Sequence, residues 1–394
     1  MPVSVLGISA IYLATPIVVF LYIYSVLKYR NQNFLSKKII YVFLSYCIFV
    51  ILISLVPILH DTDSYDLSKM TLYGIYIFIL CFMLVSCYKK SYPIDFHYKM
   101  LRDIYWVSSI NSIIAILVLV SDDIRGSVYS FIDTSPLNAV HIDIGMRSSG
   151  LFYFGGSIMS MFHCVVAYIG MIYVRYKKIH LGNRFFIFDL GLLIVNIIAI
   201  FISGRFGAVV IFLAFVAFLF LPSRISSVDK AFLLKLLSIF LCIGMIVLVY
   251  FYNELSRVIE WAFEFILNYT REGKIGSEST DVLKTMYRFP SDLLFGEGIF
   301  SQLLLGIDSG YILLIWYGGI ATVILLLLVF SLFFIVVKSN TLKNEDVYKA
   351  YVFISFLILI GNFKDIYLFA SNGMTQLYFI LFLLSCCRDR VNQW

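Results

Sequence analysis

Long apolar runs recur along almost the whole 394-residue chain and constrain its fold more than any other feature. The runs are about 20 residues long, which is the length that an α-helix needs to cross the hydrocarbon core of a bilayer. Only 14% of the residues are charged, whereas soluble domains carry about 25%. We therefore expect an all-α polytopic membrane protein in which residues 1–394 form a single integral membrane domain.

The apolar runs predict about eleven transmembrane helices, within a range of roughly 10 to 12. Lys364 and Asp365 are interpreted as an interfacial ion pair or as a loop between the last two of these helices. The expected helices are 5–27, 39–59, 71–88, 104–121, 151–174, 186–203, 206–222, 231–252, 309–337, 350–368 and 371–387.

The distribution of basic residues predicts how the chain is oriented in the membrane. Of the 30 Lys and Arg residues, 20 fall in one alternating set of connecting segments and ten in the other. Because cytoplasmic loops hold the excess of basic residues, we expect the N-terminus outside and the C-terminus inside. The net charge of +6 follows this topology and does not indicate nucleic-acid binding.

In this topology two outer loops are long, at 122–150 and 253–308. Within the second, an apolar stripe over 258–267 predicts an interfacial helix, and another short helix is expected from Ser279 or Thr280 to before Pro290. Long loops held over a rigid helical bundle are where binding and catalytic residues concentrate. We therefore look for a functional site in these outer segments.

Three of the ten outer basic residues, Arg147, Arg205 and Arg288, lie in Gly-rich segments at the mouths of apolar helices. A guanidinium beside the free N–H groups of a helix N-terminus suits the oxygens of a phosphate. Segment 203–207 is so short a turn that Arg205 is expected at or below the membrane surface, where a charge costs about 2–3 kcal/mol unless it is paired. For Arg147, contact with lipid headgroups is an equally good interpretation.

The segments around Arg288 add carboxylates and further glycines. Glu297 or Asp308 could act as a general base or bind sugar hydroxyls, and Tyr311 could help to place a sugar. Alternatively, Asp308 and Ser309 simply cap the next helix. Gly298, like Gly204 in the other segment, would let backbone approach a ligand closely.

No metal site or cofactor is expected. The seven cysteines lie in or beside apolar runs without metal-ligand spacing. Asp61 and Asp63 match an Asp-x-Asp pattern, but they are predicted to lie outside, where nucleotide sugars are absent, and a solvated acidic loop is the favoured interpretation. His163, inside an apolar helix, is interpreted as a buried histidine whose hydrogen bonds are satisfied.

Together these patterns resemble the bacterial O-antigen polymerase (Wzy) family over about residues 145–335. Arg-x-x-Gly-Leu-Phe starts at Arg147, Ser-Gly-Arg-x-Gly-Ala starts at Ser203, and Phe-Gly-x-Gly starts at Phe295. Asp-Ser-Gly-Tyr follows at 308–311 and Tyr-Gly-Gly at 317–319. The order and spacing of these motifs carry the resemblance.

The resemblance implies a glycosyltransferase of the bacterial inner membrane that works at the periplasmic face. Such enzymes transfer the growing glycan from undecaprenyl diphosphate to the next lipid-linked repeat unit, with a Wzz-type chain-length regulator as a possible partner. In this interpretation Arg147, Arg205 and Arg288 bind the diphosphate, and Asp308, Glu297 or His141 accepts a proton. Tyr311 and Asp308 help to place the acceptor.

Two departures from the family pattern bear on this assignment. The family's long loops are described by an Arg followed by a Gly after ten intervening residues, whereas nine residues separate Arg288 from Gly298. O-antigen ligases carry His-Asn where this chain has Asp308 and Ser309, which favours a polymerase. The alternatives are a ligase or another lipid-linked sugar transferase, or, outside the enzymes, a lipid-linked oligosaccharide flippase. A flippase would place charges deep within several helices, and the predicted helix interiors are nearly free of charge.

Overall fold

The computed structural model describes most of the chain outside residues 211–263 and 271–284. The described residues are 4–5, 8–29, 36–133, 142, 147–153, 155–181, 187–204, 207, 210, 264, 268–270, 285–340, 344–367 and 373–387. Within these ranges the chain is helical, apart from a short antiparallel pair of two-residue strands, β1 (Ser4–Val5) and β2 (Ile8–Ser9). The expectation of an all-α fold is confirmed for this part of the chain, with that small exception.

The longer helices correspond to the apolar runs of the sequence. The expected spans 206–222 and 231–252, and the interfacial helix expected at 258–267, lie almost wholly outside the described residues. The helices are α1 (Ala10–Lys28), α2 (Lys37–Leu59), α3 (Asp66–Ser91), α4 (Phe96–Val120), α7 (Gly156–Leu181), α8 (Ile187–Ser203), α14 (Gly310–Lys338), α15 (Glu345–Gly361) and α16 (Met374–Cys386).

Two short helices interrupt the segments expected to be loops. α5 (Asp122–Tyr129) opens the segment 122–150, because the Ser121 side chain caps it and Asp122 and Asp123 occupy its first turn. α13 (Gln302–Leu305) is capped by Ser301 and ends at Gly306. Thr285 and Met286 are the only described helical residues of the short helix expected before Pro290.

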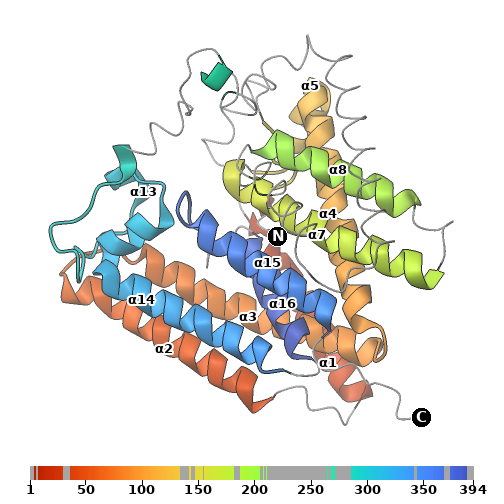
Figure 1. Ribbon diagram of the computed structural model, residues 1–394, viewed down its shortest axis with the longest axis horizontal. Coiled ribbons are helices and arrows are strands. Elements are labelled where there is room, and N and C mark those ends of the chain that lie inside the picture. The colour runs from red at the N-terminus through yellow and green to blue at the C-terminus, as the bar shows by residue number, and fades with distance from the viewer. Residues whose placement is uncertain are drawn as a thin grey trace.

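The helices form two groups that are joined by the C-terminal pair and by direct contact between α3 and α4. α2 packs against α3 and α14, whereas α4, α7 and α8 pack against one another. α15 contacts α7, and α16 contacts α3 and α14, so α15 and α16 lie between the two groups (Figure 1). α7 is the most buried of the six long apolar helices in the described part, and α4, α8 and α15 contact it.

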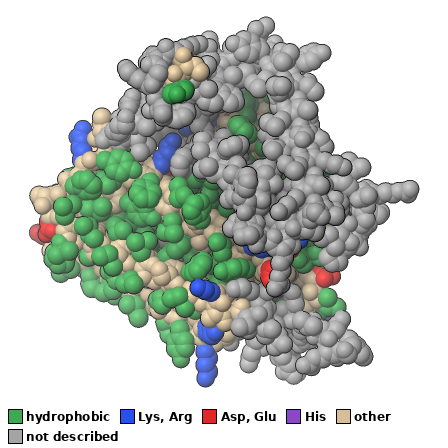
Figure 2. All heavy atoms as spheres, in the orientation of Figure 1, with side chains coloured by type: hydrophobic (Ala, Val, Ile, Leu, Met, Phe, Trp, Pro, Cys, Tyr) green, Lys and Arg blue, Asp and Glu red, His purple; other side chains and the backbone are tan. Residues whose placement is uncertain are grey.

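The described part is built to be embedded in a membrane. Six of its helices, α1, α2, α3, α4, α7 and α14, are long and apolar enough to cross one, and α8 and α16 are shorter apolar helices. Hydrophobic side chains cover the face formed by α2 and α14, with Lys and Arg at its margins (Figure 2). Large apolar residues exposed there include Ile48, Ile51, Leu328 and Ile335. This pattern suits contact with lipid tails.

Candidate functional site

The segment that precedes α7 is joined to the end of α8. The backbone N–H of Ser148 donates to the carbonyl oxygen of Ile202 at 3.1 Å, and the Ser203 hydroxyl donates to the carbonyl oxygen of Ser148 at 3.1 Å. Both serines are buried. Two segments that the sequence analysis singled out separately, those of Arg147 and of Gly204, therefore lie together.

The guanidinium of Arg147 lies at the N-terminus of α7. A Cβ placed on Gly156, the first residue of α7, would be 2.9 Å from Nη1 of Arg147. A Cβ on Gly204 would be 2.7 Å from the carbonyl oxygen of Gly156. Because the first N–H groups of a helix have no intrahelical partner, this end of α7 combines a cation with the positive end of the helix dipole.

A carboxylate meets the same turn of α7 from the other side. The hydroxyl of Ser157 donates to Oδ2 of Asp365 at 3.2 Å, which ties the connection between α15 and α16 to α7. The start of α14 is also close, since a Cβ on Gly310 would be 2.8 Å from the carbonyl oxygen of Asp365. We call the set Arg147, Gly156, Ser157, Gly204 and Asp365 the α7 corner.

The electrostatics of the α7 corner set Asp365 apart from an ordinary surface carboxylate. The pKa of Asp365 is raised to about 6, mainly by burial and also by the nearby charge of Asp308. The backbone N–H of Ile366, the Ser157 hydroxyl and Lys364 act in the opposite direction. Partial desolvation also raises the pKa of Asp308, which Lys364 opposes. Such perturbed carboxyl groups are typical of functional sites.

The residues that follow Asp308 are held against the end of α15. Ser309 occupies the N-cap position of α14 but its side chain makes no cap hydrogen bond. The hydroxyl of Tyr311 donates to the carbonyl oxygen of Leu359 at 2.9 Å, and its backbone N–H donates to the carbonyl oxygen of Asn362 at 3.1 Å. Tyr311 therefore helps to position the connection that carries Asp365, and its role in placing an acceptor sugar stays a prediction.

Arg288 lies beside the α7 corner without a contact to it among the described interactions. The side chain is exposed, its Nε donates to the carbonyl oxygen of Thr285 at 3.2 Å, and its own carbonyl oxygen accepts from Trp316 at 2.8 Å. The preceding residue, Tyr287, donates its hydroxyl to the carbonyl oxygen of Phe363 at 2.7 Å. The segment of Arg288 is thus anchored two residues before Asp365.

Glu297 is engaged in holding the loop that leads to α13. One of its carboxylate oxygens accepts from both the backbone N–H and the hydroxyl of Ser291, at 2.7 and 2.9 Å. Its own backbone N–H donates to the carbonyl oxygen of Trp316 at 2.8 Å. These contacts are those of a structural residue.

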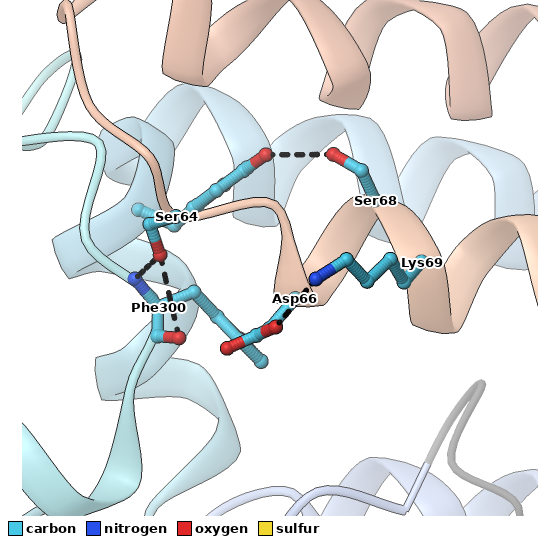
Figure 3. A network of polar contacts seen from close by, with 6 residues as sticks. Ser64, Asp66, Ser68, Lys69 and Phe300 are labelled. Atoms are coloured by element: carbon cyan, nitrogen blue, oxygen red, sulfur yellow. Dashed lines mark hydrogen bonds and ion pairs between the residues drawn. The ribbon is translucent and has the colours of Figure 1, made fainter.

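Gly298 and the residues after it are fastened to the connection between α2 and α3. A Cβ on Gly298 would be 2.6 Å from Cβ of His60. The backbone N–H of Phe300 donates to the hydroxyl of Ser64 at 2.7 Å, and Ser68 contacts the Tyr317 hydroxyl at 3.0 Å (Figure 3). Gly298 is therefore needed for close packing of backbone against this connection.

Arg205 lies outside the described residues, as does His141. Asp365, by contrast, belongs to the α7 corner although the sequence analysis assigned it only to a loop or an interfacial ion pair. The available signal was a single carboxylate in a short connection between two apolar helices on the predicted outer side. That signal does not indicate which other segment the carboxylate meets.

Buried polar side chains continue below the α7 corner, between α4, α7 and α8. The Ser112 hydroxyl donates to Oδ1 of Asn196 at 2.9 Å, and Nδ1 of His163 lies 3.1 Å from the same hydroxyl. Nδ2 of Asn196 donates to the Ser109 hydroxyl at 2.6 Å. His163 is buried as predicted, and its Nδ1 has a hydrogen-bond partner. Its Nε2 has none in the described part of the chain.

Among the described residues, no group of three or more His, Cys, Asp or Glu side chains is arranged to hold a metal ion. Comparison of the chain with known protein families, characterised proteins and solved structures finds no match. The chemistry of the site is therefore argued from its own residues.

Proposed function

We propose that the chain is a repeat-unit polymerase of the bacterial inner membrane, acting at the periplasmic face. It would transfer a growing glycan from undecaprenyl diphosphate to the next lipid-linked repeat unit. The observation that carries the proposal is the meeting of Arg147, the N-terminus of α7 and the end of α8 at one place, with Asp365 opposite. The motif resemblance over about residues 145–335 supports the same assignment.

The chemistry of this transfer requires what the α7 corner offers. The leaving group is a lipid diphosphate, on which negative charge increases as the glycosidic bond breaks. A guanidinium and the free N–H groups of a helix N-terminus stabilise such charge when they are already in position. Gly156 and Gly204 lack side chains, so the guanidinium of Arg147 and the end of α8 can both pack closely against the first turn of α7.

The buried polar groups of the spanning helices favour an enzyme over a flippase. Between α4, α7 and α8 the network at Ser112, His163 and Asn196 contains no carboxylate or ammonium group. The buried ion pair of Lys177 and Asp189, at 2.6 Å, lies at the opposite ends of α7 and α8 from the α7 corner. Charges lining a central cavity, which a transporter of charged lipids would need, are not found among the described residues.

The proposal is tested by the surface polysaccharide of a strain that lacks the chain and is complemented with variants. Arg147→Ala should abolish long-chain polysaccharide while single repeat units still appear on gels. Arg147→Lys should restore it only in part, because Lys keeps the charge but loses the planar fork of donors. Loss of every attached unit in the deletion strain would instead indicate a ligase or a flippase.

Arg125→Ala is the matched control for Arg147→Ala. Arg125 lies in the same expected outer segment and away from the α7 corner, and there it pairs with Asp122 at 3.1 Å while its Nε donates to the carbonyl oxygen of Val118 at 3.2 Å. The control strain should keep its normal chain-length distribution. Normal chain length in the Arg147→Ala strain, at matched protein level, would remove the α7 corner from the reaction.

A further inference from the structure

We propose that Asp365 is the catalytic base of this transfer and takes the proton from the acceptor hydroxyl. The inference rests on the proposed function and deepens it, because it assigns a second chemical role within the α7 corner. Its starting point is that neighbouring residues of α7 touch groups of opposite charge. Gly156 lies against the Arg147 guanidinium, and Ser157 is bonded to the Asp365 carboxylate.

The carboxylate of Asp365 is held in one orientation and still has capacity to accept a proton. Oδ1 accepts from the backbone N–H of Ile366 at 2.8 Å and Oδ2 accepts from the Ser157 hydroxyl at 3.2 Å. An ionised carboxylate offers about four lone-pair sites, so these two bonds leave others for a substrate hydroxyl. A fixed base with free lone pairs is what general-base catalysis requires.

The other carboxylates predicted from the sequence are placed less well for this role. One carboxylate oxygen of Glu297 is occupied by Ser291, and no described contact joins Glu297 to the α7 corner. Asp308 is exposed, and in the described part of the chain no contact joins its carboxylate to α7. Asp365 is the carboxylate bonded directly to the first turn of α7, where the diphosphate is proposed to bind.

A second observation indicates that the α7 corner can receive a polar ligand. Ser309 is 1% exposed, and its hydroxyl has no hydrogen-bond partner in the described part of the chain. The next residue, Gly310, is the one whose Cβ position lies 2.8 Å from the carbonyl oxygen of Asp365. Because buried hydroxyls are ordinarily paired, a buried hydroxyl without a described protein partner so close in sequence to this contact is unusual.

The reaction step balances with groups already named. The acceptor hydroxyl oxygen forms a bond to the anomeric carbon of the donor glycan, and the bond from that carbon to the diphosphate oxygen breaks. The electron pair of the broken bond stays on the diphosphate, beside Arg147 and the α7 N-terminus. The hydroxyl proton passes to the carboxylate of Asp365, which later releases it to water.

The groups that face Asp365 predict how the reaction depends on pH. A base must be ionised, so the rate should rise with pH through the pKa of Asp365, which lies at about 6. Asp308 raises that pKa, whereas Ser157 and Lys364 lower it. The guanidinium of Arg147 lies beside Gly156, the residue of α7 that precedes Ser157. Removing Ser157 or Asp308 should therefore move the acid limb of the profile in opposite directions.

The test uses the purified full chain in lipid nanodiscs, with lipid-linked repeat units extracted from the bacterium that encodes it. Asp365→Asn should slow elongation by about 100-fold or more, the usual contribution of a general base. Ser157→Ala should shift the acid limb of the rate profile to higher pH, and Asp308→Asn should shift it to lower pH. A residue that only supports the fold would change the amount of active protein without moving the limb.

The outcomes separate this inference from the proposed function. Two results would overturn the role of Asp365 while the wild type elongates. One is an acid limb that stays unchanged in both Ser157→Ala and Asp308→Asn. The other is elongation by Asp365→Asn at a rate within about tenfold of the wild type. Failure of the wild type to elongate units that crude membranes of the same strain do elongate would overturn the proposed function itself. Asp365→Glu tests folding independently, because it keeps the carboxylate and should retain part of the rate with a similar acid limb.

Discussion

At the scale of single residues, the absence of a side chain decides whether the α7 corner can form. Gly204 sits so close to α7 that an added Cβ would lie 2.7 Å from the carbonyl oxygen of Gly156. The carbonyl oxygen of Gly204 in turn accepts from the Ser160 hydroxyl at 2.6 Å. Backbone packed on backbone leaves no flexible side chain to move aside, so the end of α8 and the start of α7 depend on this glycine.

Gly204→Ala is therefore expected to destabilise the protein by about 1–3 kcal/mol, as overpacking does. Gly191→Ala is the matched control, because Gly191 lies in the same helix, α8, and has nothing within 4 Å of its Cβ position. That change should be neutral or stabilise by up to about 1 kcal/mol, since Ala favours a helix. Melting temperatures in detergent measure both effects, and equal melting temperatures for the two variants would contradict the close packing.

At the scale of elements, the break in α14 couples the segment after Arg288 to the bundle. Gly318 and Gly319 are non-helical inside α14, and Gly319 has φ 67° and ψ −168°, which is a conformation essentially restricted to glycine. At this break the N–H of Ile320 donates to Leu293 at 2.9 Å and that of Ala321 to Leu294 at 3.3 Å. The outer loop thus replaces hydrogen bonds that the helix loses.

Gly319→Ala should be among the most disruptive single changes to this element. A Cβ there would lie 2.0 Å from the carbonyl oxygen of Leu294, in addition to the backbone strain, so we expect a loss above about 3 kcal/mol or failure to accumulate. Gly306→Ala separates the two causes, because Gly306 has φ 62° but nothing within 4 Å of its Cβ position. It should cost only about 1–2 kcal/mol, the strain of a left-handed residue. Protein levels in membranes and melting temperature are the measurements, and similar losses in both variants would argue against the clash.

At the scale of the whole molecule, the outer segments of the predicted topology gather at one end of the bundle. The connection between α2 and α3 contacts the loop at 298–300, since the Thr62 hydroxyl donates to the carbonyl oxygen of Gly298 at 2.9 Å. The same loop is bonded to α14, and Gly310, at the start of α14, abuts Asp365. The distribution of Lys and Arg predicts that this end lies on the outer side of the membrane.

Cysteine labelling of α3 tests that side directly. In a background without the seven natural cysteines, Asp63→Cys just before α3 should react in intact spheroplasts with a maleimide that cannot cross membranes. Ser91→Cys, at the other end of the same helix, should react only after the membrane is opened, and both residues are exposed. The reverse pattern would place the α7 corner in the cytoplasm and would rule out a periplasmic polymerase.

The sequence predicted the class of fold and part of the candidate site. The length of the apolar runs identified each of the described helices that are long enough to span a membrane. This works because every such helix must by itself keep charges out of the lipid and satisfy its own backbone hydrogen bonds. It missed α5, although Ser121 followed by two aspartates is a helix-start signal. For the site, the structure places Arg147 and Gly204 together at helix ends, and it places Glu297 and Gly298 in loop contacts, while the predicted roles of all four stay predictions. Their residue types did not distinguish ligand contact from close packing.

The sequence by itself determined that this chain is helical and membrane-embedded, and which of its residues are unusual for their surroundings. Only the tertiary structure decided which of those residues meet. Asp365 and Ser157 are 208 positions apart in the chain, and their contact depends on how α15 packs against α7. Apolar runs specify that a helix is buried in lipid but not which neighbour it takes, because lipid tails and leucine side chains are equally apolar. The partner is chosen by small residues and buried hydrogen bonds, and these act only once the helices are packed.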